Sequence, residues 1–193
     1  MGITSVSKNN LYVAVTHLCT NRCVFCPHKL ELPDPPLDDI MNEIASYELD
    51  SFSEIVFAGA GEPTCRLYDM FSICRAIREV SSTPIHVFTN GHASMILAED
   101  TAPLFRGLVD HVSIMLGAPD SERYMQFCRP RFGEDTFTGV MKFAREIAKV
   151  VPEVDMTAFH GTLSPEDFDR CFAIAQDIGI PFQMCEPIFP SVV

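Results

Sequence analysis

The segment CTNRCVFC, residues 19–26, places Cys19, Cys23 and Cys26 within eight positions. Three thiolates at this spacing can bind one metal centre, and soft thiolates select zinc or iron–sulfur centres. A structural zinc site has four ligands, and His28 offers a fourth. A site with only three thiolates leaves one position open for a molecule that binds during chemistry. The motif therefore predicts either an open iron–sulfur site or a Cys3His zinc site.

Short β-rich runs alternate with helical patterns on both sides of this segment. The expected strands cover residues 11–17, 54–59, 85–91, 110–116, 154–159 and 180–186. Helical periodicity starts at Leu37 and Leu67, crosses 94–99, and resumes at Phe137 and Ser164, while 117–135 has the character of a long connection. Six strands separated by helices predict an α/β fold with a mostly parallel sheet, either an open doubly wound sheet or a partial barrel.

Four polar segments follow four of these strands. They are the cysteine segment, AGEP (60–63), TNG (89–91) and GAPD (117–120). The active sites of parallel α/β folds lie at the carboxyl ends of the strands. We therefore expect these four segments to meet at one edge of the sheet and to form the active site.

Composition and net charge limit the classes of function that the protein can have. The chain has 193 residues and a formal net charge of −12, with 26 acidic against 14 basic side chains. This excess of acidic side chains argues against general, non-specific binding to nucleic acid or anionic membranes. With no export pattern and no apolar run near the roughly 18 residues of a membrane span, we expect a single cytoplasmic domain over 1–193. Its eight cysteines are then ligands, reactive groups or buried apolar residues rather than disulfides.

The cysteine spacing, with Phe25 directly before the last cysteine, resembles the radical S-adenosylmethionine (SAM) superfamily. The resemblance implies a partial (β/α)6 barrel of the TIM type. It implies that Cys19, Cys23 and Cys26 hold three irons of a [4Fe–4S] cluster and that SAM chelates the fourth. Reductive cleavage of SAM would yield a 5′-deoxyadenosyl radical that abstracts hydrogen from an unidentified substrate. Backbone N–H groups of residues 20–22 are expected to point toward the sulfides.

A second segment strengthens the resemblance. Gly59-Ala60-Gly61-Glu62-Pro63 is similar to the GGEP motif that holds the SAM amino group, with Ala60 in place of the usual glycine. Strand-end carbonyls and a carboxylate accept hydrogen bonds from an ammonium, and glycines permit close approach. The resemblance implies that all five residues bind cofactor.

Three further positions bear on the SAM site. The resemblance places Phe25 beside the adenine. Near the end of the fourth expected strand, Met115 and Gly117 stand where it implies serine and asparagine. We take Asn90 and Ser113 as candidate substitutes.

Within the superfamily, the chain resembles the small proteins associated with TatD-family hydrolases. The segments that carry this likeness include VFAGAGEPT (56–64), DHVSIMLGAP (110–119) and YMQFCRPRFG (124–133). It implies an electron donor such as flavodoxin or ferredoxin and a possible TatD-like hydrolase partner. A chain that is nearly all core would leave the barrel mouth wide, which suggests a macromolecular substrate or a partner that completes the site.

Two other functions stay open. One is a zinc-stabilised Cys3His binding module, and the other is a degenerate protein that binds SAM and a cluster without radical chemistry. Cys65, Cys128 and Cys185 fall near the expected active edge, where they would hold an auxiliary cluster, supply a catalytic thiol, or be unreactive. The histidines at 17, 86, 92, 111 and 160 form no convincing metal set by sequence, and we interpret them as structural.

Overall fold

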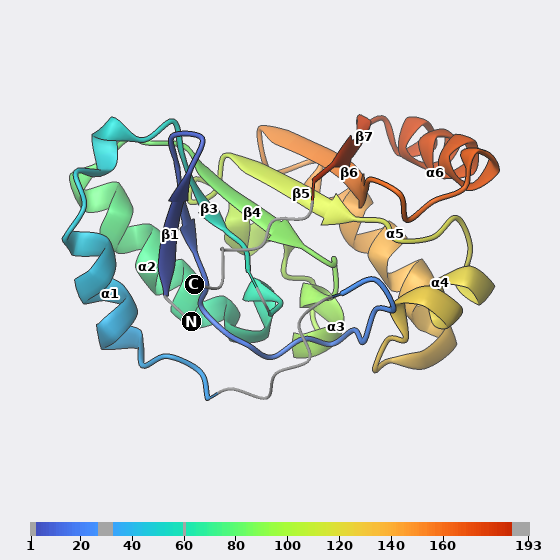
Figure 1. Ribbon diagram of the computed structural model, residues 1–193, viewed down its shortest axis with the longest axis horizontal. Coiled ribbons are helices and arrows are strands. Elements are labelled where there is room, and N and C mark those ends of the chain that lie inside the picture. Colours follow the sequence, from blue (N-terminus) through green and yellow to red (C-terminus); the bar gives the residue numbers. More distant parts are fainter. Residues whose placement is uncertain (1–2, 27–32, 60, 187–193) are drawn as a thin grey trace.

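A sheet of seven strands in sequential order forms the framework of the protein (Figure 1). The structure is a computed structural model, and it describes residues 3–26, 33–59 and 61–186. The strands are β1 (Thr4–Ser7), β2 (Asn10–Val13), β3 (Glu54–Phe57), β4 (Ile85–Thr89), β5 (His111–Met115), β6 (Glu153–Phe159) and β7 (Phe182–Cys185). β1 is antiparallel to β2, and every later neighbour is parallel. The expected mostly parallel α/β sheet is confirmed, and it is open, with β1 and β7 at its edges.

The first strand was missed by sequence reasoning, which expected six strands. β1 has the polar sequence TSVS and is half-exposed, so it lacks an apolar pattern. It joins β2 through Lys8 and Asn9, whose φ angles of 48° and 64° fit the two-residue hairpin turn that matches strand twist. The expected strand 11–17 also ends early, at Val13, because the chain leaves the sheet there to begin the cysteine segment.

Six helices connect or flank the parallel strands. They are α1 (Leu37–Ala45), α2 (Leu67–Val80), α3 (Ala93–Leu97), α4 (Ser121–Cys128), α5 (Thr136–Ile147) and α6 (Pro165–Ile178), with short 3-10 turns at Leu49–Ser51, Pro63–Arg66, Ala102–Phe105 and Gly133–Asp135. α6 begins and ends as its sequence predicts, because Ser164 Oγ accepts from Asp167 N at 3.2 Å and Gly179 has a φ of 88°. α4 lies inside 117–135, where only a connection was expected.

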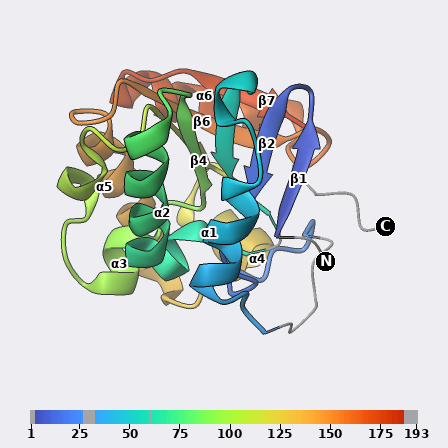
Figure 2. The same cartoon turned by 90° about the vertical axis from the view of Figure 1, so that its left-hand side faces the viewer.

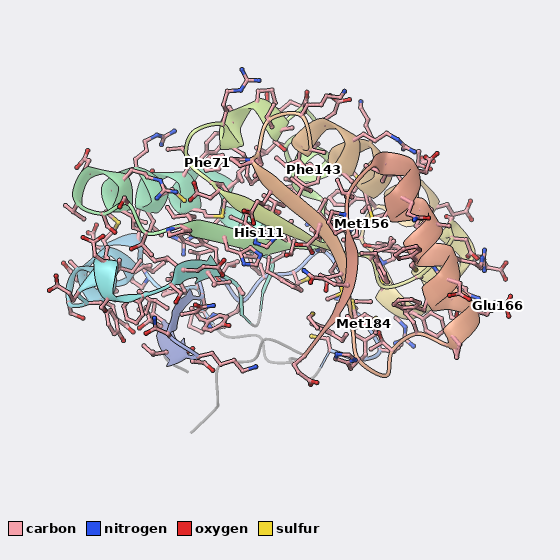
Figure 3. All side chains as sticks on the ribbon, turned by 90° about the horizontal axis from the view of Figure 1, so that it is seen from above. Phe71, His111, Phe143, Met156, Glu166 and Met184 are labelled. Carbon is pink, nitrogen blue, oxygen red and sulfur yellow. The ribbon has the colours of Figure 1, made fainter. Side chains whose placement is uncertain are left out.

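The two faces of the sheet differ in chemistry. On the face toward the helices, Val13, Phe57, Val87, Val112 and Val154 lie side by side across five strands, and all are buried. Figure 2 shows α1 and α2 side by side next to the strands, and Figure 3 shows the helices around the outer side of the curved sheet with Phe71 and Phe143 among them. The inner face is mixed, with His86, His111, Ser113 and Asp155 on the same side as Phe88 and Phe159. Helices along the outer side are the arrangement of a partial barrel rather than a doubly wound sheet.

Two further observations concern the cysteines and the helices. All eight cysteines are free, and Cys74 and Cys171 are fully buried on α2 and α6. No helix in the described part of the chain has the length and apolar character needed to cross a bilayer.

Candidate active site

The cysteine segment leaves the end of β2 and is fixed by backbone hydrogen bonds to the region of α4. Arg22 N donates to Cys128 O at 2.9 Å, and Val24 N donates to Phe127 O at 2.8 Å. In return, Arg131 N donates to Thr20 O at 2.8 Å. The helix missed by sequence analysis therefore holds the metal-binding segment in place.

The thiols of Cys19, Cys23 and Cys26 face a common region and are close enough to interact electrostatically. Cys19 is exposed, and the other two are half-buried. Among the described residues, no group of three cysteines has its sulfur atoms all within 4.8 Å of one another. Three thiolates on one segment can each bind a separate iron of a cuboidal cluster.

Donors to sulfur are present at Cys19. Asn21 N donates to Cys19 Sγ at 3.4 Å, and Asn90 Nδ2 lies 3.8 Å from the same atom. Asn21 N thus donates to a cysteine sulfur, and the expected contact with a cluster sulfide stays a prediction. The expectation is wrong for Arg22, whose N–H is used by the carbonyl of Cys128. His28 and Ala60 lie outside the described residues.

A buried network of polar side chains also fixes the position of the cysteine segment. Asn90 Nδ2 donates to Thr20 Oγ1 at 3.0 Å, Thr20 Oγ1 lies 2.8 Å from His92 Nδ1, and His92 Nε2 lies 2.9 Å from Tyr124 Oη. Each ring nitrogen of His92 therefore has a hydroxyl partner, so the neutral imidazole is satisfied whichever nitrogen carries its proton. His92 is fully buried, and burial lowers its pKa to about 3. Its structural role is the one expected from the sequence.

The glycines after β3 allow two backbones to touch. A Cβ on Gly61 would lie 2.4 Å from Thr16 O and 2.7 Å from Leu18 O. A Cβ on Gly59 would lie 3.0 Å from Ala14 Cβ, and Gly59 has a φ of 144°. The glycines of this motif therefore allow close approach to the start of the cysteine segment, and the predicted approach of the SAM ammonium stays a prediction.

Glu62 ties the ends of β3 and β4 together. Its carboxylate is buried and accepts from Thr64 N at 3.1 Å, Thr64 Oγ1 at 2.7 Å, Thr89 Oγ1 at 2.6 Å and Asn90 N at 2.6 Å. Burial raises the pKa of Glu62, against the effect of these hydrogen bonds. Three of the four bonds go to Oε1, so Oε2 keeps acceptor capacity for a further donor. Pro63 begins the 3-10 turn that Glu62 caps.

The structure places Phe25 and Asn90 with the cysteines but not Ser113. Phe25 packs edge-on against Phe159, with ring centroids 6.0 Å apart. A Cβ on Gly117 would lie 3.2 Å from Phe25 Cζ and 2.7 Å from Cys128 Sγ, which explains the glycine at that position. Ser113 lies within β5, where its hydroxyl bonds to Asp155 and His86 on the inner face.

The three remaining cysteines near this edge have different neighbours. Cys128 is buried, and its thiol hydrogen-bonds to Cys23 and raises the pKa of Cys23. Cys65 interacts electrostatically with Glu62 and Cys19. Cys185 Sγ accepts from Thr157 Oγ1 at 3.1 Å. Within the described residues, the three thiols do not gather around one point.

Comparison with known proteins identifies a protein family whose model matches most of this chain. A model described as the Radical SAM superfamily matches residues 13–181. GTP 3′,8-cyclase of Lactiplantibacillus plantarum is 29% identical over 124 residues, which cover 61% of this chain and 36% of that protein. The chain thus spans little more than a third of the length of this curated relative.

Solved structures share the fold at low identity. A radical SAM methyltransferase from Sphaerobacter thermophilus has a TM-score of 0.69 and 13% identity, covering 94% of this chain and 57% of that one. Streptococcus suis SuiB bound to precursor peptide SuiA has a TM-score of 0.63 and 16% identity, covering 93% and 39%. At such identities the likeness shows the fold alone.

Replacing Gly61 with alanine is expected to displace the cysteine segment. The new methyl group would collide with two backbone carbonyls, so the variant should lose about 2 kcal/mol or more of stability and part of its iron. Thermal unfolding and iron content after anaerobic reconstitution measure both effects. Gly133→Ala is the control, since its Cβ would meet nothing within 4 Å and only its φ of 74° opposes it. Equal behaviour of the two variants would contradict the close-approach argument.

Replacing His92 with glutamine should make the fold less sensitive to acid. Burial lowers the pKa of His92 from the ordinary 6.5 of a histidine to about 3, so between these values the unfolded chain binds more protons than the folded protein. The free energy of unfolding therefore falls as pH decreases through this window, by at most about 1.4 kcal/mol per pH unit for one proton. Urea unfolding from pH 4.5 upward should show a shallower slope in His92→Gln.

The matched control for this slope is His160→Gln, because His160 is exposed. It should keep the slope of the wild-type protein. If His92→Gln also kept that slope, His92 would not be the buried neutral group described above.

Proposed function

The chain belongs to the Radical SAM superfamily, and from this premise we propose that it is the catalytic core of an enzyme that cleaves SAM reductively. The cofactors of the superfamily are a [4Fe–4S] cluster and SAM. When bound, they supply an adenosyl radical that abstracts a hydrogen atom from the substrate. We further propose that residues 1–193 form one domain of this type. Three thiols of one segment, which starts against the glycine-lined end of β3, carry the proposal.

Each motif then has a proposed role. Cys19, Cys23 and Cys26 bind three irons, and Asn21 N and Asn90 Nδ2 donate toward the sulfur of Cys19. Residues 59–63 receive the SAM amino group, with Glu62 Oε2 as the acceptor that has capacity left. Phe25 lies beside the adenine and is held against Phe159. Asn90 contributes to the same site. Ser113 is no longer a SAM contact in this proposal, because its hydroxyl is used on the inner face.

Replacing Cys23 with alanine tests the assignment directly. Anaerobically reconstituted wild-type protein should contain about four irons per chain, absorb as a brown cluster, and release 5′-deoxyadenosine from SAM with a strong reductant. Cys23→Ala should lose the iron, the colour and the product. Cys171→Ala, which removes a buried thiol on α6, should keep all three.

Two results would contradict this proposal in different ways. About one zinc per chain and no colour, in protein never exposed to oxygen, would favour a zinc-stabilised binding module. A complete cluster without any 5′-deoxyadenosine would favour a protein that binds SAM and cluster without radical chemistry.

We propose a macromolecular substrate. Leu18 and Val24 flank Cys19 and Cys23 and leave 60% and 48% of their surface exposed, which is unusual for apolar side chains beside a reactive centre. The fold is also that of SuiB, which has been solved with a precursor peptide. The net charge of −12 disfavours nucleic acid.

The substrate class is testable without knowing the substrate. The macromolecular fraction of a cell extract should accelerate release of 5′-deoxyadenosine by the reconstituted protein, and the small-molecule fraction should not. Leu18→Asp with Val24→Asp should reduce this acceleration while basal cleavage of SAM persists. Acceleration by the small-molecule fraction alone would contradict the proposal.

Partners and location complete the proposal. An electron donor such as flavodoxin or ferredoxin would reduce the cluster. A TatD-like hydrolase is the proposed partner, supported by the resemblance of the chain to the small TatD-associated proteins. Eight free cysteines and an oxygen-labile cluster favour a reducing cytoplasm.

A further inference from the structure

The inner face of the sheet carries a cluster of two histidines and two carboxylates that the proposed function does not use. Parallel register sets His86 beside His111 and Ser113 beside Asp155. Glu54 approaches His86 from the start of β3. Figure 3 shows His111 in the middle of the curved sheet, on the other side from Phe71 and Phe143.

The two imidazole rings stack against each other next to Glu54. Their centroids are 3.8 Å apart and their planes differ by 11°. Glu54 Oε2 lies 3.5 Å from His86 Nδ1. One ligand atom from each of Glu54, His86 and His111 lies within 4.8 Å of the other two, and no other such set occurs in the described ranges. Two histidines and one carboxylate are a common ligand set for zinc and for divalent iron.

The outer nitrogens of both rings are already used. His111 Nε2 hydrogen-bonds to Asp155 Oδ2, and because a carboxylate only accepts, Nε2 carries the proton. Ser113 Oγ donates to the same oxygen at 2.9 Å, so it accepts from His86 Nε2 at 2.9 Å. In both rings the lone pair is left on Nδ1. A histidine that donates one N–H to a carboxylate or hydroxyl and offers the other nitrogen is the usual state of a metal ligand.

Two carboxylates face the two rings, so the cluster favours a positive charge at the rings. A lone pair on His86 Nδ1 facing the carboxylate of Glu54 is unfavourable, and either a proton on Nδ1 or a bound cation relieves it. Asp155 is only 3% exposed, and its Oδ1 has no hydrogen-bond partner among the described residues. The hydrogen bond from His86 lowers the pKa of Glu54. Burial would raise the pKa of Asp155, but hydrogen bonds from His111 and Ser113 hold it below its usual value.

A hollow reaches one side of the cluster. His111 and Asp155 line this hollow of about 900 Å³ together with Glu153, Pro181 and Gln183, whereas Glu54 and His86 do not line it. Glu153 begins β6 and Pro181 precedes β7, so the hollow lies at the edge of the sheet opposite the cysteine segment.

We propose that Glu54, His86 and His111 form a second metal site, which binds a divalent first-row transition ion, Zn²⁺ in the first instance. Asp155 and Ser113 are positioning residues that fix the ring nitrogens. Three protein ligands leave a coordination position for water or another oxygen donor. Because parallel rings direct their lone pairs side by side, the two rings must tilt apart when the ion binds. The site does not depend on the cluster or on SAM.

Metal content of the cluster-loaded full chain tests the proposal. After equilibration at buffered micromolar free Zn²⁺ and desalting, the protein should hold about one zinc per chain in addition to its iron. His86→Asn and His111→Asn should lose the zinc and keep the iron. His160→Asn, at an exposed histidine outside the cluster, should keep both. Zinc retained in full by both site variants, or absent from the wild-type protein, would overturn the proposal.

Two further measurements guard against misfolding and misplaced zinc. Glu54→Gln changes a partly exposed side chain, and Asp155→Asn changes the partner shared by His111 and Ser113. Each should weaken zinc binding about 10–100-fold with circular dichroism unchanged. X-ray absorption at the zinc edge should show only nitrogen and oxygen neighbours at about 2.0–2.2 Å. Sulfur at about 2.3 Å would place the zinc on cysteines and overturn the proposal.

Discussion

A carboxylate without access to water holds the active edge together. Removing a carboxylate from water costs several kcal/mol, and hydrogen bonds to its oxygens offset that cost. Glu62 accepts four such bonds, from its own turn and from the end of β4, and Oε2 still has room for another donor. The bond to Asn90 N orients a side chain that reaches Thr20 and Cys19. The position of the metal-binding segment thus follows from the burial of one charge on a neighbouring strand.

The second support is the contact with α4. Three backbone bonds and the chain of Thr20, His92 and Tyr124 join the cysteine segment to a helix that lies about a hundred positions later in the sequence. Buried polar chains of this kind are stable only when fully satisfied, so they specify one arrangement. A segment that must bind a cluster at three points gains from such rigidity, because thiolates that are already placed need less reordering when metal arrives.

The sequence was most informative where local patterns and the fold agree. The cysteine spacing, the glycines after β3 and the caps of α6 each depend on a few neighbouring residues, so they were visible without structure. β1 was not visible, because an edge strand with the sequence TSVS lacks an apolar pattern. α4 was missed although Asp120 caps it, since Arg123 N donates to Asp120 Oδ1 at 2.8 Å; aspartate three residues before the capped N–H was an available signal.

The inner-face histidines show a different limit. His86 and His111 alternate with buried apolar residues, as strand residues on a half-buried sheet do, and nothing local marks them as partners. Only the register between β4 and β5 brings the rings together, and register is a property of the whole sheet. The same limit explains Ser113, whose neighbours Asp155 and His86 come from strands on both sides.

The tight contact between positions 117 and 128 has a consequence for sequence divergence. A Cβ on Gly117 would lie 2.7 Å from Cys128 Sγ, which is an overlap. The side chains at positions 117 and 128 therefore compete for the same space beside Phe25. Homologues with serine or asparagine at 117 should then carry alanine or glycine at 128. A change at either position alone would worsen the packing. Substitutions at the two positions should therefore occur together in evolution. They should leave a covariation signal although the two side chains exchange no hydrogen bond.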